Sequence, residues 1–149
     1  MKKILALRFL TIIFVVLFVF SSVALADQRK NIKVFKTHNA VTIAAGGSST
    51  SAAIPLDEYR PDGYFSIQVD LSGDGTAKFE YLLSNDEVTY IDPTGATDIG
   101  SGLTKTGGVA GDGTEHYSFS PELAKSMKII VTETGSSSSV TVTVTLAIQ

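Results

Sequence analysis

Strict alternation of apolar and polar residues is the feature that most limits what this chain can fold into. The segment 140–148 reads Val-Thr-Val-Thr-Val-Thr-Leu-Ala-Ile, so its large aliphatic side chains fall on one face. A period of two fits a half-buried β-strand and does not fit an amphipathic helix. The same alternation recurs over 63–70 and 76–83. It places together Phe65, Ile67 and Val69 in the first segment, and Ala77, Phe79, Tyr81 and Leu83 in the second.

Shorter apolar or alternating segments extend this pattern along the rest of the chain. They predict strands at 32–36, 40–44, 52–56, 88–91, 116–119 and 127–133. About eight or nine short strands, spaced by roughly 8–12 residues, are typical of a sandwich or barrel. A chain of 149 residues has room for one domain. The sequence therefore predicts an all-β fold, a single antiparallel β-sandwich that is jelly-roll-like.

The predicted strands are separated by turn-forming residues. Ser72-Gly-Asp-Gly75 contains Asp-Gly, a strong short-range hairpin signal, and predicts a hairpin that joins the strands on either side. The segments 84–87 and 135–139 predict two further turns. The Gly-rich stretch 92–115 is expected to be a long loop. The one helical candidate is 121–125, which has Ser120 as N-cap and begins with proline.

The first 26 residues have the three parts of a secretory signal peptide. Three basic residues precede an apolar run at 9–20, and Ala24 and Ala26 have the spacing that a signal peptidase reads. A membrane anchor is the alternative, but a span needs about 20 apolar residues, and here the uninterrupted run has 12. We expect cleavage after Ala26. The mature chain would then be secreted or periplasmic, and not membrane-spanning.

Charge is distributed unevenly after the leader. Residues 27–36 hold four basic residues and one acid, whereas residues 37–149 hold five basic residues and 14 acids. We therefore divide the mature chain into a basic N-terminal arm with the first strands, 27–45, and a β-sandwich body, 46–149. The candidate residues of an assembly arm are Arg29, Lys30, Lys33, Phe35 and Lys36.

Two strand-forming segments, 37–56 and 134–149, carry no charged residue. Natural edge strands usually carry a charge or a proline that blocks pairing with another chain. One interpretation is that both segments are central strands of their own sheets. The other is that the arm adds to the sheet of a neighbouring copy, steered by its charge. Deletion of 27–36 is then expected to abolish assembly and to leave the body folded.

Residues that could carry catalysis or bind a metal do not form a recognisable pattern. The chain has no cysteine, its only histidines are His38 and His116, and no Gly-x-Ser-x-Gly motif occurs. The segment 70–76 starts like a calcium loop, but the closing position of an EF-hand is occupied by Tyr81. A looser calcium site would use Asp92, Asp98 and Asp112. We expect no enzyme and no cofactor.

Carbohydrate binding is the alternative function for an exported sandwich, because sugar rings stack on aromatic side chains. The mature chain has no tryptophan. The candidate ligand platform is therefore Tyr59, Tyr64 and Tyr90, together with the loop 92–115, with or without calcium. A nucleic-acid role is not expected, because the body is acidic.

The stretch 64–149 resembles small, mostly uncharacterised β-sandwich proteins encoded in bacterial and phage genomes. The segments that carry the resemblance are 65–69, 79–86, 117–124, 132–135 and 146–149. The Ser84-Asn-Asp turn also resembles strand turns of discoidin-like sandwiches, although Glu87 stands near a position where those often have glycine. The resemblance implies a structural or surface-attachment role and transfers no site. The leader departs from the setting of a virion protein.

The sequence therefore predicts an exported, non-catalytic β-sandwich that is structural or adhesive and self-assembles by strand addition. Its expected partner is a second copy of itself or a cell-surface glycan. The alternative is a secreted glycan-binding module.

Overall fold

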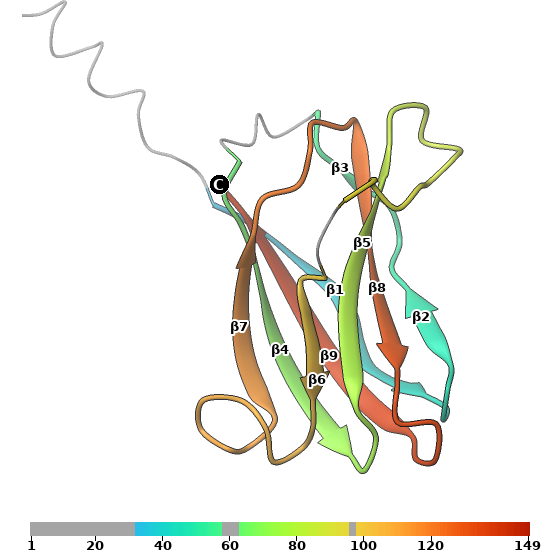
Figure 1. Ribbon diagram of the computed structural model, residues 1–149. Coiled ribbons are helices and arrows are strands. Elements are labelled where there is room, and N and C mark those ends of the chain that lie inside the picture. The colour runs from blue at the N-terminus through green and yellow to red at the C-terminus, as the bar shows by residue number, and fades with distance from the viewer. Residues whose placement is uncertain (1–31, 58–62, 96–97) are drawn as a thin grey trace, which may run out of the picture. The chain divides into compact units, whose positions relative to one another are not determined.

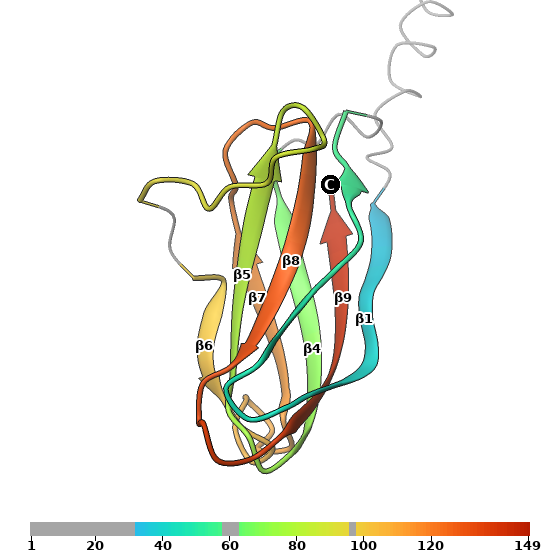
Figure 2. The same cartoon turned by 90° about the vertical axis from the view of Figure 1, so that its right-hand side faces the viewer.

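Residues 32–57, 63–95 and 98–149 are described by a computed structural model, in which 32–149 form one compact unit. Its two antiparallel sheets form a sandwich, which confirms the predicted fold class (Figures 1 and 2). The strands are β1 Lys33–Ile43, β2 Ser48–Thr50, β3 Ile54–Pro55, β4 Phe65–Gly73, β5 Ala77–Ser84, β6 Gly100–Leu103, β7 Thr114–Phe119, β8 Ser126–Glu133 and β9 Val140–Ile148. The leader and its cleavage site lie outside the described residues. The described part holds no helix that is long and apolar enough to span a membrane.

The two sheets share one core. Sheet A has the strand order β1-β9-β4-β7, and sheet B has the order β2-β8-β5-β6, with β3 also paired to β8. Alternate residues of the central strands point between the sheets, as the sequence pattern predicts. The side chains that are less than 2% exposed include Ile67, Val69, Phe79, Met127, Ile129, Val140, Val142 and Leu146. The core is therefore built mainly by β4, β5, β8 and β9.

The segment 72–75 is not a hairpin, which corrects the prediction from its Asp-Gly pair. β4 pairs with β9 and β7, whereas β5 pairs with β8 and β6, so this segment crosses from sheet A to sheet B. Gly73 has φ +90°, and a Cβ there would lie 2.8 Å from the Ser139 carbonyl oxygen. Glycine is thus required by the left-handed backbone and by the neighbouring 135–139 connection, which also crosses between sheets.

The predicted helix at 121–125 is absent. The backbone N–H of Lys125 donates to the Ser84 carbonyl, and the N–H of Leu56 donates to the Lys125 carbonyl. These bonds to other segments replace the bonds that a helical turn would make, and five residues are too few to form a stable helix alone. The predicted strand 88–91 is reduced to one bridge, between Ile91 and Leu83.

The stretch 92–115 is not all loop, because β6 lies inside it and pairs with β5. Its sequence, Gly-Ser-Gly-Leu, lacks the β-branched and aromatic residues that signal a strand. Gly100 is needed for packing rather than for a turn: a Cβ there would lie 2.6 Å from the ring of Tyr117.

β1 runs from 33 to 43 without a break, although two segments were predicted. Its pairing with β9 has irregularities between Lys36 and His38 and between His38 and Val41, and Ala40 has φ +50°. β9 is central, as one of the two interpretations of the charge-free segments requires. β1, in contrast, is an edge strand of its own sheet.

Three of the connections at the lower end of the sandwich in Figure 1, β1–β2, β4–β5 and β8–β9, are bound by one buried carboxylate. Glu133 is 1% exposed. Its Oε1 accepts the N–H groups of Thr76 and Gly135, at 3.1 and 2.7 Å, and its Oε2 accepts those of Gly46 and Ser136, at 2.7 and 3.0 Å. These four bonds lower the pKa of Glu133, those from Gly46 and Thr76 most. We call this arrangement the Glu133 clasp. It ties together three of the connections between the sheets, namely β1–β2, β4–β5 and β8–β9.

Candidate contact surfaces

Six of the seven exposed large hydrophobic residues of the described chain belong to segments at the opposite, upper end of the sandwich, namely the starts of β1 and β4 and the loops after β5 and β7 (Figure 1). Seven large hydrophobic residues of the described chain are exposed. Ile32, Val34 and Tyr64 lie on the outer face of sheet A, and Val88, Ile91 and Leu123 lie on the loops that follow β5 and β7. The seventh, Val109, lies in the loop between β6 and β7. Clustered exposed hydrophobic residues mark contact sites more often than scattered ones do.

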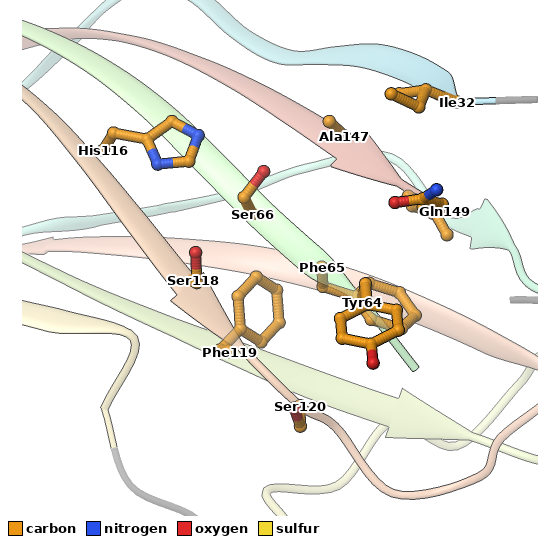
Figure 3. Close-up of a pocket in the computed structure, with 11 residues that line it drawn as sticks. Ile32, Tyr64, Phe65, Ser66, His116, Ser118, Phe119, Ser120, Ala147 and Gln149 are labelled. Atoms are coloured by element: carbon orange, nitrogen blue, oxygen red, sulfur yellow. The ribbon is translucent and has the colours of Figure 1, made fainter. Parts of the chain in front are cut away.

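The first surface is a groove of about 300 Å³ on the outer face of sheet A, which we call the Tyr64 groove (Figure 3). The sheet register explains its shape. Ala147, Ser66 and Ser118 lie opposite one another on three adjacent strands, so small side chains form a floor. The next row along the sheet, Thr145, Gln68 and His116, is made of longer side chains. A row of small residues beside rows of larger ones makes a hollow in an otherwise flat sheet.

The other end of the groove is formed by Tyr64, Gln149 and Ile32. The Gln149 N–H donates to the Tyr64 carbonyl at 3.0 Å, which fixes these two residues next to each other. Tyr64 is 66% exposed. Beneath the floor, the rings of Phe65 and Phe119 lie 5.6 Å apart, and Phe119 also packs against Tyr81. The groove is therefore supported by an aromatic cluster that belongs to the core.

The groove has polar groups but no charged side chain in its lining. Its hydrogen-bonding residues are Ser66, Ser118, Ser120, His116 and Gln149, and the rest of the lining is apolar or aromatic. Figure 3 shows the Ser66 and Ser118 hydroxyls, the His116 ring and the Gln149 amide spread along it. The site therefore suits a neutral ligand better than an ion.

The second surface is formed by the loops 84–93 and 120–125, and we call it the loop patch. A groove of about 400 Å³ lies between them, lined in part by Ile91, Pro93, Leu123 and Ala124. Leu123 is 95% exposed, and Val88, in the same loop as Ile91, is 83% exposed. These loops hold four acidic residues and one basic residue, Lys125.

The first of these loops is held by Asp86. Its Oδ1 accepts the Val88 and Thr89 N–H groups at 2.9 and 2.7 Å, and the Ser84 hydroxyl at 2.8 Å. These bonds, the Thr89 one first, hold the pKa of Asp86 well below its usual range. The turn predicted at 84–87 is thus confirmed. It fixes the apolar side chains that follow it in an exposed position.

Two residues of the predicted ligand platform, Tyr64 and Tyr90, lie on different surfaces. Tyr64 is exposed in its groove, and Tyr59 lies outside the described residues. The Tyr90 hydroxyl is 2.9 Å from the Ser126 hydroxyl, and Lys128 Nζ lies 3.9 Å from the centre of the Tyr90 ring. One face of the Tyr90 ring is therefore covered by a cation.

The structure describes three of the five predicted arm residues, namely Lys33, Phe35 and Lys36. All three lie in β1 and pair with β9 of the same chain, and Phe35 packs against the core. Arg29 and Lys30 lie outside the described residues.

The looser calcium site is not assembled. No group of three metal-ligating acidic or histidine side chains occurs in the part of the chain that the structure describes. Asp98 pairs with Lys78 at 3.2 Å, and Asp112 accepts the Thr114 N–H at 3.0 Å.

The two histidines have different environments. His38 is buried, and its Nε2 lies 3.3 Å from the Ser49 carbonyl oxygen. Burial lowers its pKa, and the contact with Ser49 opposes that shift. His116 is exposed at the Tyr64 groove.

Sequence reasoning missed most residues of both surfaces. Alternation places Tyr64 and Ser66 on the outer face of a strand, but only the register brings Ser118 and Gln149 beside them. Local patterns assign Val88 to a strand and Leu123 to a helix. Their exposure follows from loops that local patterns did not predict.

No protein-family model and no curated protein sequence matches this chain. Among solved structures, it is similar to VP2 of the infectious bursal disease virus subviral particle, with 12% identity and a TM-score of 0.53. The match covers 81% of this chain and 32% of VP2, so the chain spans about a third of the VP2 chain.

Two small bacterial or phage proteins are also similar. Aeromonas hydrophila PliG, a periplasmic lysozyme inhibitor of g-type lysozyme, has 15% identity and a TM-score of 0.44, with 82% of this chain and 90% of PliG covered. The SPBc2 prophage-derived protein YomS has 15% identity and a TM-score of 0.38, with 80% and 94% covered. At 12% identity, the VP2 match shows a shared fold alone. PliG and YomS are similar in structure, and no sequence family accompanies the resemblance.

Proposed function

We propose that this chain is an exported, non-catalytic contact protein that associates with copies of itself. The observation that carries the proposal is the pair of exposed apolar surfaces with opposite charge around them. Ile32 and Val34, 60% and 63% exposed, lie beside Lys33 and Lys36 on β1. The loop patch exposes Val88, Ile91 and Leu123 among acidic residues.

A contact between the start of β1 and the loop patch of another copy would bury apolar surface on both sides. It would also bring the basic arm of one copy to the acidic loops of the next, and such charge complementarity steers association and fixes orientation. Because the two surfaces differ, the contact is heterologous. It builds a filament unless the rotation between copies closes a ring.

The original form of the hypothesis, in which residues 29–45 add to the sheet of a neighbour, needs β1 to leave its own body. That exchange would break the pairing of β1 with β9 and withdraw Phe35 and His38 from the core. The contact proposed here leaves β1 in place, so it avoids that cost.

The test is the solution mass of residues 27–149 by size-exclusion chromatography with light scattering. We expect a defined oligomer or polymers that shift to monomer in Lys33→Glu/Lys36→Glu and in Leu123→Ser. The matched control is Lys105→Glu, a charge reversal in the β6–β7 loop. Combining Lys33→Glu/Lys36→Glu with Glu87→Lys/Glu122→Lys should restore the oligomer. A wild-type chain that stays monomeric at high concentration contradicts self-association.

Export has its own test. We expect the chain isolated from its native host's periplasm or medium to begin at Asp27, as measured by intact mass or N-terminal sequencing. An uncleaved chain in the membrane fraction would favour the anchor alternative.

The Tyr64 groove favours a second candidate function, a ligand-binding module. Its exposed ring, polar lining and small-residue floor form a built hollow. The two candidates share Ile32, which lines the groove and also lies in the contact proposed for the start of β1. Glycan binding and solution mass are therefore measured separately, in a variant at Tyr64, which the self-association contact does not use.

A further inference from the structure

We propose that the Tyr64 groove binds a ring of a neutral saccharide. This inference rests on the second candidate function above and names its ligand class. It moves the predicted glycan site away from Tyr90 and the loop 92–115, to residues on β4, β7 and β9.

The platform is the Tyr64 ring. A sugar ring presents axial C–H groups on its face, which pack well on an aromatic ring. Tyr64 stands at the end of a floor made of Ala147, Ser66 and Ser118. Side chains this small leave room for a ring that packs against Tyr64 and spans the neighbouring strands.

The polar groups match the hydroxyl rim of a sugar. Hydroxyls both donate and accept, the Gln149 amide offers one group of each kind, and a neutral imidazole does the same. Within the described part of the chain, no hydrogen bond to another residue occupies the Ser66 and Ser118 hydroxyls, the Gln149 side-chain amide or the His116 ring. These groups are available to a ligand. A bound ligand displaces water from them, so it has to form hydrogen bonds with them in place of that water.

Neutrality follows from the lining. None of the lining residues is Asp, Glu, Lys or Arg, so no side chain of these four types would offset the desolvation of a carboxylate, sulfate or ammonium group. A uronic or sialic acid would therefore bind less well than a neutral hexose of similar shape.

The affinity of one groove should be low. A volume of about 300 Å³ is at the small end for ligand sites, and a shallow site of this kind has a Kd on the order of 1 mM. Such weak sites become effective when several are displayed together.

The experiment is a titration of ¹⁵N-labelled residues 27–149 with neutral tetrasaccharides of glucose, N-acetylglucosamine, mannose and xylose, each to 20 times the expected Kd, roughly 20 mM. We expect at least one to shift the amide signals of residues 64–66, 116–120 and 147–149. Tyr64→Ala should weaken that binding at least tenfold, whereas Tyr64→Phe should retain it. Tyr90→Phe is the control at the covered tyrosine.

A charged counterpart, tetragalacturonate, should bind more weakly than the best neutral sugar. The proposal is overturned if no neutral sugar shifts these signals, if the shifts map elsewhere, or if Tyr64→Ala binds as well as wild type. The solution mass of Tyr64→Ala should match that of wild type. If Tyr64→Ala loses glycan binding and keeps the wild-type solution mass, the groove binds glycan and self-association does not depend on it. If Tyr64→Ala keeps glycan binding and changes its solution mass, the glycan proposal is wrong and Tyr64 contributes to self-association.

Discussion

At the scale of the residue, the Glu133 clasp joins three connections through one side chain. Each carboxylate oxygen accepts two backbone N–H groups. In Glu133→Gln, one of these positions becomes an NH₂ group that cannot accept, so two N–H groups lose their partner whichever way the amide turns. We expect the Tm at pH 7 to fall by about 5 °C or more. The control is Asp70→Asn, the same loss of charge at an exposed position. Equal shifts in the two variants would contradict the role of the clasp.

The clasp also predicts an acid limb of stability. The pKa of Glu133 is lower in the folded chain than its usual 4.5. Its stabilisation is therefore complete above pH 4.5 and is lost as the pH falls through the folded value. Thermal melts between pH 6 and 3 should show a shallower decline for Glu133→Gln than for wild type.

His38 predicts a second, milder pH dependence. Burial lowers its pKa below 6.5. Below pH 6.5 the unfolded chain therefore takes up a proton that the folded chain does not, and folding becomes less favourable. We expect wild type to lose Tm between pH 7.5 and 5.5, and His38→Gln to lose less. The control is His116→Gln, at an exposed position, whose Tm should change with pH as that of wild type does. If the Tm of His38→Gln changes with pH as much as that of wild type, His38 is not the source of the pH dependence.

At the scale of the element, β1 gives a clear prediction. Deleting residues 27–31 leaves all described pairs of β1 intact, whereas deleting 27–36 removes the pairs of Lys33 to Lys36 with β9 and the packing of Phe35. We therefore expect the longer deletion to lower Tm by about 5 °C or more relative to the shorter one, as measured by circular dichroism. The earlier expectation, that the body stays intact after deletion of 27–36, does not take this pairing into account. If the two deletion variants have the same Tm, the expectation of an intact body is correct.

The same scale shows what the sequence could predict. Alternation predicted the faces of β4, β5, β8 and β9, because burial against one core has a period of two along any strand. It did not predict their partners. The Asp-Gly pair at 74–75 is a local signal, whereas the choice between a hairpin and a crossing depends on β9 and β8, more than 50 residues away. The segment 121–125 has a helix-like start, but bonds to Ser84 and Leu56 hold it in another conformation.

At the scale of the whole molecule, the two ends of the sandwich differ. One end has connections that are bound by a buried carboxylate, and the other end has exposed apolar residues. Glu133 binds three connections at the first, and the segments that carry the apolar residues of both contact surfaces lie at the second (Figure 1). Tyr64 was the one member of the predicted platform that the structure places in a groove. Its neighbours Ser118 and Gln149 are distant in sequence, so composition and spacing could not single them out.

The pairing of β1 with β9 has a mechanical consequence. Lys33 lies opposite Ile148, and Ile43 lies opposite Val140. A pulling force applied between residues 32 and 149 therefore acts at one end of the antiparallel β1–β9 ladder. It breaks the hydrogen bonds between these strands one after another rather than all at once. A tether at residue 32 and a ligand held in the Tyr64 groove would load nearly the same point. The force would then pass from β4 through β9 to β1, across the first residue pairs of both ladders.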